Sequence, residues 1–168
     1  MLGAAQRKPV WMTLRGARDP AAAILSRFEV KRAPVPVYEI AEAMGITVVE
    51  EELPVTGILD AEDRDEVRIH VNVFDPPTRR RFTVAHELGH LMLHPLGVEY
   101  RDFVTSWNGG KKERQANHFA VDLLMPEWLV RPAFRWFKGD LAGMAEYFEV
   151  SQPAMEIRFQ ELYGRADR

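Results

Sequence analysis

The stretch "RFTVAHELGHLMLHP", residues 81–95, constrains the fold more than any other part of the sequence. It carries His86, His90 and His94 at a spacing of four, among mostly apolar neighbours. Residues four apart share one face of a helix, about 6 Å from each other. The stretch therefore predicts a helix that packs on a core, with a histidine face that is either a metal site or a polar stripe.

Helix geometry separates the three histidines. His86 and His90 lie one turn apart and can point their rings at one ion. His94 lies about 12 Å along the axis from His86, whereas a Zn–N bond is about 2.1 Å. One ion cannot be held by all three, and His94 is expected at the helix end, near the negative pole of the helix dipole.

Glu87 completes the HExxH pattern with His86 and His90. It is rotated by about 100° from His86, so it borders an ion without needing to bind it. In this pattern the two histidines hold Zn²⁺ and the glutamate is the general base. Water is a poor nucleophile at neutral pH, and binding to catalytic zinc lowers its pKa to about 7. The pattern predicts metal-assisted hydrolysis.

The third metal ligand must come from another segment. The helix predicted from "ERQANHFAVDLLMP", residues 113–126, offers candidates. Glu113 begins this helix, and Asn117 lies one turn later on the same face. Packing of the two helices would bring Glu113 over both histidines, which gives a His₂Glu shell with an open position. Asn117 could then orient a ligand. Asp122 falls on a different face, and His118 is the rival, but it points away from the face that Glu113 and Asn117 share.

Composition narrows the remaining choices. The chain has 168 residues, 46% of them hydrophobic, which fits one domain with a real core. A net charge of −3 argues against a broad nucleic-acid surface. Without cysteine, only His, Asp, Glu or water can hold a metal. We expect a cytoplasmic protein, since the N-terminus lacks a signal-peptide pattern and no apolar run reaches the ~20 residues of a membrane span.

Periodicity and turn residues predict a helical start, a β region and then helices. The expected domains are an irregular arm over 1–19, a core over 20–126, and a helical part over 127–168 within the same compact unit. Asp19 and Ser151 are expected to cap helices. The expected strands are 46–53, 57–60 and 66–73, the last two forming a hairpin, and 96–112 is expected to be a surface loop.

The last two predicted helices resemble a helix-turn-helix pair. A DNA reader would carry basic or amide side chains at the start of its second helix. That helix instead mixes acidic, basic and amide residues, which favours packing or protein recognition over DNA binding. These residues are Gln152, Glu156, Arg158, Gln160 and Glu161.

The two segments "RFTVAHELGHLMLH" and "ERQANHFAVDLLMP" together resemble the ImmA/IrrE family of zinc metallopeptidases, and the likeness extends over about residues 20–164. The resemblance implies an α+β, thermolysin-like (zincin-like) fold, with a small, mostly antiparallel sheet packed on the HExxH helix and helices after it. It implies one Zn²⁺ per chain, held by His86, His90 and Glu113, with Glu87 as general base.

The resemblance also implies a partner. Family members cleave and inactivate a helix-turn-helix repressor of the Xre type, often encoded next door. The alternative is a toxin or regulator of a toxin–antitoxin-like pair that acts by binding such a partner without peptidase activity.

Two groups of residues have open roles at this point. Arg79, Arg80 and Arg81 oppose the dipole of their helix, so they are expected either to pair with the acidic 60–66 turn or to dock an acidic partner. Tyr100 and Trp107 fall in the predicted loop, where they either line a substrate groove or pack the loop itself.

Overall fold

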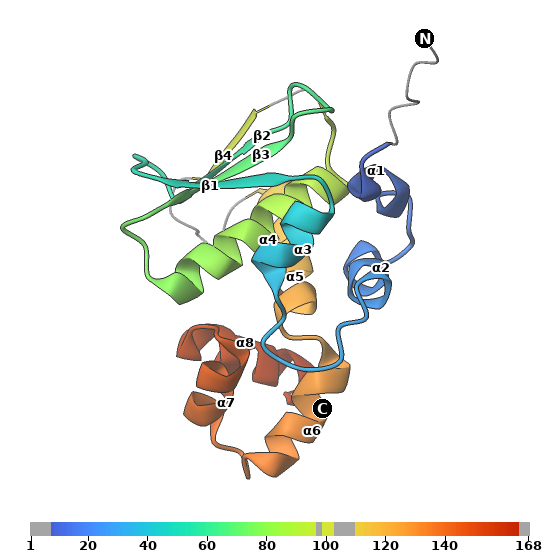
Figure 1. Ribbon diagram of the computed structural model, residues 1–168. Coiled ribbons are helices and arrows are strands. Elements are labelled where there is room, and N and C mark those ends of the chain that lie inside the picture. Colours follow the sequence, from blue (N-terminus) through green and yellow to red (C-terminus); the bar gives the residue numbers. More distant parts are fainter. Residues whose placement is uncertain (1–7, 97–98, 103–109, 165–168) are drawn as a thin grey trace.

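The computed structural model describes residues 8–96, 99–102 and 110–164, and it confirms the α+β class (Figure 1). The helices of the described part are α1 (Val10–Leu14), α2 (Pro20–Arg27), α3 (Val37–Ala43), α4 (Pro77–Leu93), α5 (Lys111–Leu124), α6 (Glu127–Trp136), α7 (Leu141–Phe148) and α8 (Gln152–Tyr163). Its strands are β1 (Thr47–Glu51), β2 (Gly57–Asp60), β3 (Arg68–Asn72) and β4 (Glu99–Asp102).

The four strands form one sheet in the order β1-β3-β2-β4. β1 runs parallel to β3, while β2 is antiparallel to both β3 and β4, so the sheet is mostly antiparallel as expected. The predicted hairpin is confirmed as β2 and β3, with Leu59 opposite Ile69. Both side chains are fully buried, and this apolar face covers α4 (Figure 1).

The expectation of a surface loop over 96–112 is wrong in part, because β4 lies within it. In the strand pairing Tyr100 lies opposite Leu59 and Asp102 lies opposite Gly57. The sequence "EYRD" lacks the β-branched pattern of a strand, and the free edge of β2 supplies the pairing instead. Trp107 lies outside the described residues.

The expectation of an irregular arm over 1–19 also fails in part. Residues 10–14 form the short helix α1, whose Trp11 is 1% exposed and belongs to the core. Arg15 donates a hydrogen bond to the carbonyl of His94, which ties α1 to the end of α4. Asp19 caps α2 as expected and accepts from the Ala22 amide at 3.0 Å. One buried aromatic side chain thus orders a segment that has no helical periodicity.

The arginines at the start of α4 pair with residues that sequence reasoning did not name. Arg80 Nη1 lies 2.8 Å from Glu50 of β1, and Arg81 Nη1 lies 3.4 Å from Glu149 after α7. The expected pairing with the 60–66 turn is wrong for these two residues. That turn precedes β3, whereas α4 begins after β3, so the turn and the arginines lie at opposite ends of this strand.

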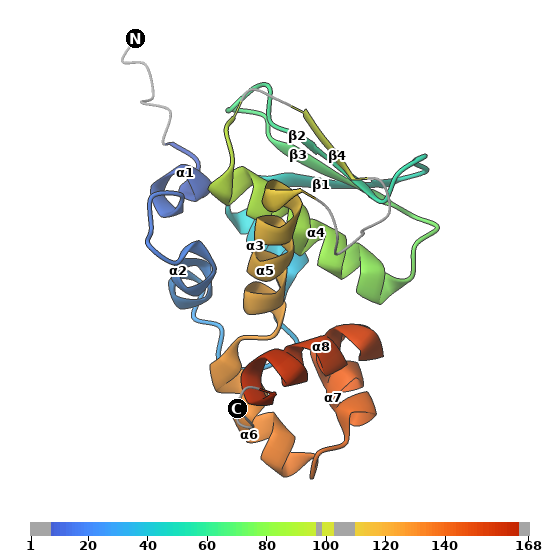
Figure 2. The same cartoon turned by 180° about the vertical axis from the view of Figure 1, so that it is seen from behind.

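α4 lies between the sheet and α5, and two glycines permit the close packing (Figure 2). A methyl group at Gly57 would overlap Cγ2 of Thr83 and lie 3.0 Å from Oε1 of Glu87. A methyl group at Gly89 would lie 3.0 Å from both Cα and O of Ala116. Both faces of the HExxH helix therefore need glycine at the point of contact.

Within the described ranges, no helix combines the length and apolar character needed to cross a membrane.

We expect Gly89→Ala to lower the free energy of unfolding by about 1–3 kcal/mol, because α4 and α5 must move apart. Urea denaturation measures this change. Gly16→Ala is the matched control, since no atom lies within 4 Å of the added methyl group. Stability equal to or above that of the wild type in Gly89→Ala would contradict the close approach.

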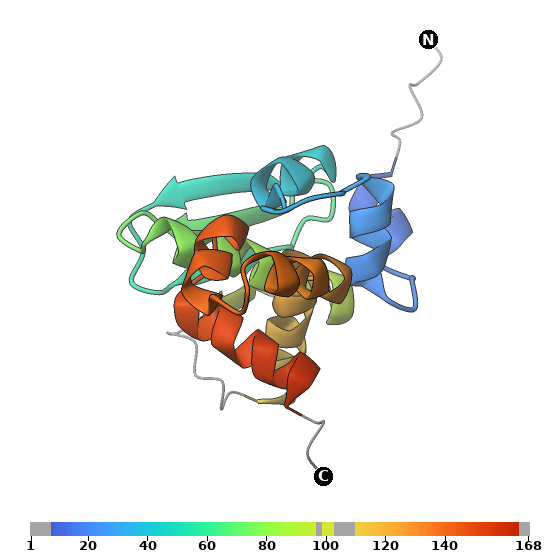
Figure 3. The same cartoon turned by 90° about the horizontal axis from the view of Figure 1, so that it is seen from below.

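The C-terminal helices lie at the far end of the molecule from the sheet (Figure 1), and Figure 3 shows them from below, nearest to the viewer. Asp140 caps α7, and Ser151 caps α8 as expected, accepting from the Ala154 amide at 3.3 Å. Arg158, a candidate DNA-contacting residue, is only 7% exposed. Its guanidinium is bonded inside the molecule, to the Met125 carbonyl at 2.9 Å and to Asp122 at 3.0 Å.

Candidate metal centre

α4 places the first two polar rings of the site. His86 and His90 lie one turn apart, and their Nε2 atoms approach to 3.0 Å. Their side chains are 1% and 0% exposed. Two buried rings that direct nitrogen atoms at one point form a favourable pair of metal donors, because an imidazole nitrogen binds metals when it is not protonated.

α5 brings a carboxylate to the same point. Oε2 of Glu113 lies 3.2 Å from Nε2 of His86, and Oε1 lies 3.3 Å from Nε2 of His90. The Glu113 side chain is 36% exposed, so solvent reaches the cluster from its side. The structure therefore brings together the three residues that the sequence predicted as a ligand set.

The cluster fits a small divalent cation. Ligands placed tetrahedrally at about 2.1 Å from zinc lie about 3.4 Å from each other, close to the three separations in this cluster. Two neutral imidazoles and one carboxylate are the donors of catalytic zinc sites that keep a position open. Within the described residues, His86, His90 and Glu113 form the one group of His, Asp or Glu side chains with this compactness.

Asn117 fixes the orientation of the first ring. Its Oδ1 atom lies 2.8 Å from Nδ1 of His86, and its side chain is 2% exposed. An amide oxygen only accepts, so Nδ1 of His86 carries the proton and donates it. The Nε2 atom of His86 then presents its lone pair to the cluster. Asn117, which was expected to orient a metal ligand, thus contacts one of the two histidines.

His94 plays a part that sequence reasoning missed. Its Nδ1 atom lies 2.8 Å from Nδ1 of His90, and its Nε2 atom lies 3.2 Å from Oε1 of Gln115. Because Gln115 accepts through its oxygen, Nε2 of His94 donates, and Nδ1 of His94 is left to accept from His90. Because Nδ1 of His90 carries the proton, its Nε2 atom presents a lone pair to the cluster. The spacing of four residues between His90 and His94 is the sequence feature that could have predicted this contact.

Burial also decides the charge of His94. The side chain is 4% exposed, and this desolvation lowers the pKa of His94 below its ordinary value. His94 is the C-cap residue of α4, at the helix end as expected, and its burial favours the neutral ring. A neutral ring is what the hydrogen bond from His90 requires.

Glu87 is buried on the sheet side of α4. Its side chain is 0% exposed, and Oε1 lies beside Gly57 of β2. It follows His86 directly in the chain, so a carboxylate and the histidine pair occupy one turn of one helix. A carboxylate in this position borders the histidine pair without belonging to the His86–His90–Glu113 group.

Comparison with known sequences identifies the family. The sequence profile of the IrrE N-terminal-like domain, the M78 peptidase family, matches residues 41–160, which is more than half of the chain. The chain belongs to this family. The match includes all of α4 and α5, and it confirms the resemblance seen in the HExxH and "ERQAN" segments.

Individual relatives agree with this assignment. "Uncharacterized immunity region protein 2" of Bacillus phage phi105 is 34% identical over 96 residues, covering 55% of this chain and 60% of that protein. Metallopeptidase ImmA of Bacillus subtilis (strain 168) is 26% identical over 136 residues, covering 79% of each. The chain thus spans less than two thirds of the phage protein.

A solved structure shows the same fold. A Mycobacterium tuberculosis transcriptional regulator superposes with a TM-score of 0.61 at 17% identity. The match covers 95% of this chain and 48% of the regulator, so this IrrE-type domain corresponds to about half of that larger chain.

His118, Asp122 and His70 of this IrrE-type domain lie outside the cluster. His118 is exposed and lies 3.9 Å from Glu161 of α8. The Asp122 carboxylate forms an ion pair with Arg158 of α8. His70 contacts Glu51 on the neighbouring strand β1. Their positions agree with the sequence prediction that His118 and Asp122 face away from the site.

The bond between His94 and His90 gives a testable expectation. We expect His94→Leu to weaken zinc binding by about 10–100-fold, as loss of partners that orient metal ligands does. A competition titration with a chromophoric chelator measures the affinity. His118→Leu is the matched control and should bind zinc as the wild type does. Equal zinc affinity in His94→Leu and the wild type would show that His90 needs no such partner.

Proposed function

We propose that this protein is a zinc-dependent endopeptidase that cleaves and inactivates a helix-turn-helix repressor. The observation that carries the proposal is the cluster of His86, His90 and Glu113 with a buried Glu87 beside it, in a chain of the M78 peptidase family. The three proposed metal ligands leave an open position, which is the arrangement of hydrolytic rather than structural zinc sites.

The residues of the chain divide the work as follows. When bound, zinc supplies Lewis-acid polarisation and lowers the pKa of water to about 7. Asn117 and His94 hold the two histidine rings in the tautomer that leaves Nε2 free. Glu87 accepts the proton of the water that attacks the peptide carbonyl carbon, and it passes this proton to the amine that leaves when the C–N bond breaks.

The substrate class rests on the relatives. The phage relative is named an immunity region protein, and a metallopeptidase named ImmA aligns over 79% of this chain. Together with the family resemblance, these names support a repressor as substrate. Direct DNA contact by α8 finds no support, because Arg158 is bonded inside the molecule.

Co-incubation of the zinc-loaded protein with the helix-turn-helix repressor encoded beside it tests the proposal. We expect mass spectrometry to find discrete repressor fragments, and none when a chelator has removed the metal. A stable complex of the two proteins without any cleavage would instead support the toxin or regulator hypothesis. If the repressor is neither cleaved nor bound, this result would contradict the repressor as partner.

A further inference from the structure

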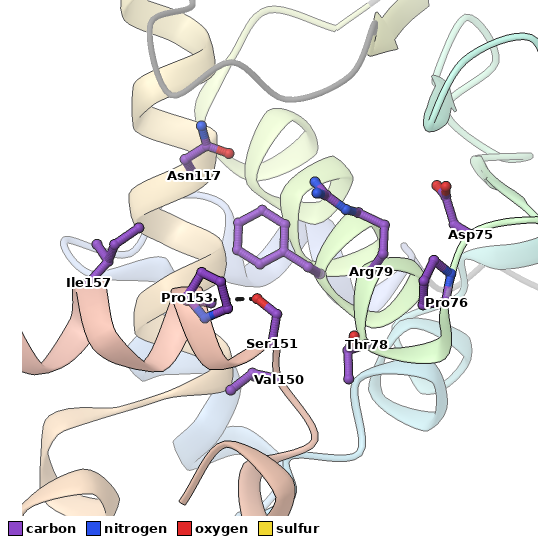
Figure 4. A pocket seen from close by; sticks show the side chains of 11 residues that line it. Asp75, Pro76, Thr78, Arg79, Asn117, Val150, Ser151, Pro153 and Ile157 are labelled. Carbon is purple, nitrogen blue, oxygen red and sulfur yellow. Dashed lines mark hydrogen bonds between the residues drawn. The ribbon is translucent and has the colours of Figure 1, made fainter. Parts of the chain in front are cut away.

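A cavity of about 530 Å³ lies between α4, α5 and α8 (Figure 4). α4 and the residues before it line one side, α8 and the turn before it line the opposite side, and α5 contributes one residue. Its lining includes Phe82 of α4, Asn117 of α5, and Val150, Ala154 and Ile157 at α8. The volume is that of a binding pocket, for which about 300–1,000 Å³ is typical.

The cavity borders the candidate metal centre through two of its lining residues. Asn117 lines it and also accepts the hydrogen bond from His86. Phe82 lines it one helical turn before His86, and the two ring centroids are 6.4 Å apart. A molecule that fills the cavity therefore touches residues in direct contact with a proposed metal ligand.

Two arginines hold the walls of the cavity at a fixed separation. Arg158 of α8 binds the Met125 carbonyl at 2.9 Å and Asp122 of α5 at 3.0 Å. Arg81 of α4 donates to the carbonyl of Glu149, in the turn between α7 and α8, at 3.2 Å. The helix pair that resembles a DNA-binding unit is thus attached to the two helices of the metal centre, and the cavity lies between the attachments.

The lining is mostly apolar along α8 and more polar around the start of α4 (Figure 4). Phe82, Val150, Pro153, Ala154 and Ile157 offer only apolar side chains, and Ile157 projects from α8 (Figure 4). Asp75, Thr78, Arg79 and Ser151 place polar groups around them. Such a lining retains a large apolar group through burial and leaves room at the polar side for a peptide backbone.

We propose that this cavity binds a bulky apolar side chain of the peptide substrate, and that α8 is the wall that selects it. The inference rests on the proposed function, and it gives the C-terminal helix pair a role in substrate recognition. The volume exceeds a single side chain, so residues next to the apolar anchor also enter the cavity.

Binding to an inactive protein tests the pocket without relying on cleavage. Zinc-loaded Glu87→Gln protein, labelled with nitrogen-15, is titrated with the capped peptide acetyl-Gly-Gly-Phe-Gly-Gly-amide and with its alanine counterpart. We expect the phenylalanine peptide to bind more tightly by on the order of tenfold. Amide shifts should concentrate at Val150, Ala154 and Ile157. Equal binding of both peptides, or shifts elsewhere, would overturn the proposal.

Filling the cavity gives the matched comparison. Ile157→Trp places an indole in the pocket and should abolish the preference for phenylalanine. Glu156→Trp adds the same group to α8 at an exposed residue that does not line the cavity, and it should retain the preference. Ala154→Leu serves as a smaller filling if Ile157→Trp does not fold. A preference that survives filling would contradict the pocket.

A casein digest separates this inference from the proposed function. We expect the wild type to cleave casein next to large apolar residues and Ile157→Trp to cleave it next to smaller ones. This result would support both the peptidase activity and the pocket. No cleavage of casein or repressor, combined with a peptide preference in the titration, contradicts the peptidase and leaves the pocket standing. Cleavage without any side-chain preference contradicts the pocket and leaves the peptidase standing.

Discussion

Glu87→Gln is expected to lower repressor cleavage by about 10²–10⁴-fold, the usual contribution of a general base. The amide has nearly the same shape as the carboxylate, but it cannot accept the proton of the attacking water. Glu87 is outside the His86–His90–Glu113 cluster, so the variant should still bind one zinc ion per chain. Fragment yield over time and metal content by mass spectrometry are the two measurements.

A control separates chemistry from folding in this experiment. Glu146→Gln makes the same change at an exposed position of α7 and should cleave as the wild type does. Thermal unfolding of both variants should show a folded protein. Full cleavage by Glu87→Gln would rule out this carboxylate as the base.

Glu113→Gln is expected to weaken zinc binding by more than about 100-fold. Loss of a residue that only orients a metal ligand weakens metal binding by about 10–100-fold, and loss of a ligand should weaken it more. The two carboxylate oxygens lie 3.2 and 3.3 Å from the histidine nitrogens, so both face the proposed ion. The amide removes the negative charge that balances a divalent cation. Cleavage should fall with the metal content and recover in part at high zinc concentration.

Glu127→Gln tests whether any lost carboxylate would act in the same way. Glu127 is exposed in the first turn of α6 and pairs with Arg131, away from the cluster. Its replacement should leave zinc affinity unchanged. Wild-type zinc affinity in Glu113→Gln would show that the third ligand comes from another residue.

The core of the site follows from local helical geometry, which is why the sequence predicts it. A spacing of four sets His86 and His90 together whatever the rest of the fold does. Glu113 and Asn117 share a face of α5 by the same rule, and the structure places that face against the histidines. The caps at Asp19 and Ser151 are equally local.

Features that depend on distant partners were not predictable in this way. β4 exists because β2 offers an unpaired edge, and α1 is ordered by the burial of Trp11. Gln115 acquires its role only through the packing of α5 beside His94. No periodicity in the sequence reports contacts of this kind.

α5 contributes several residues to the metal centre and to its support. It contributes Glu113 to the cluster, Gln115 and Asn117 to the orientation of the two rings, and Ala116 to the contact with Gly89. The contacts of Asn117 with His86 and of Gln115 with His94 thus depend on the packing of α4 on α5. A change that separates the two helices should affect metal binding before it affects the sheet.

Anomalous X-ray diffraction at the zinc edge, on crystals of the zinc-loaded protein, tests whether α4 and α5 together hold a zinc ion. We expect one strong peak at about 2.0–2.2 Å from Nε2 of His86, Nε2 of His90 and a carboxylate oxygen of Glu113. A peak held by other residues, or no peak between α4 and α5, would contradict it.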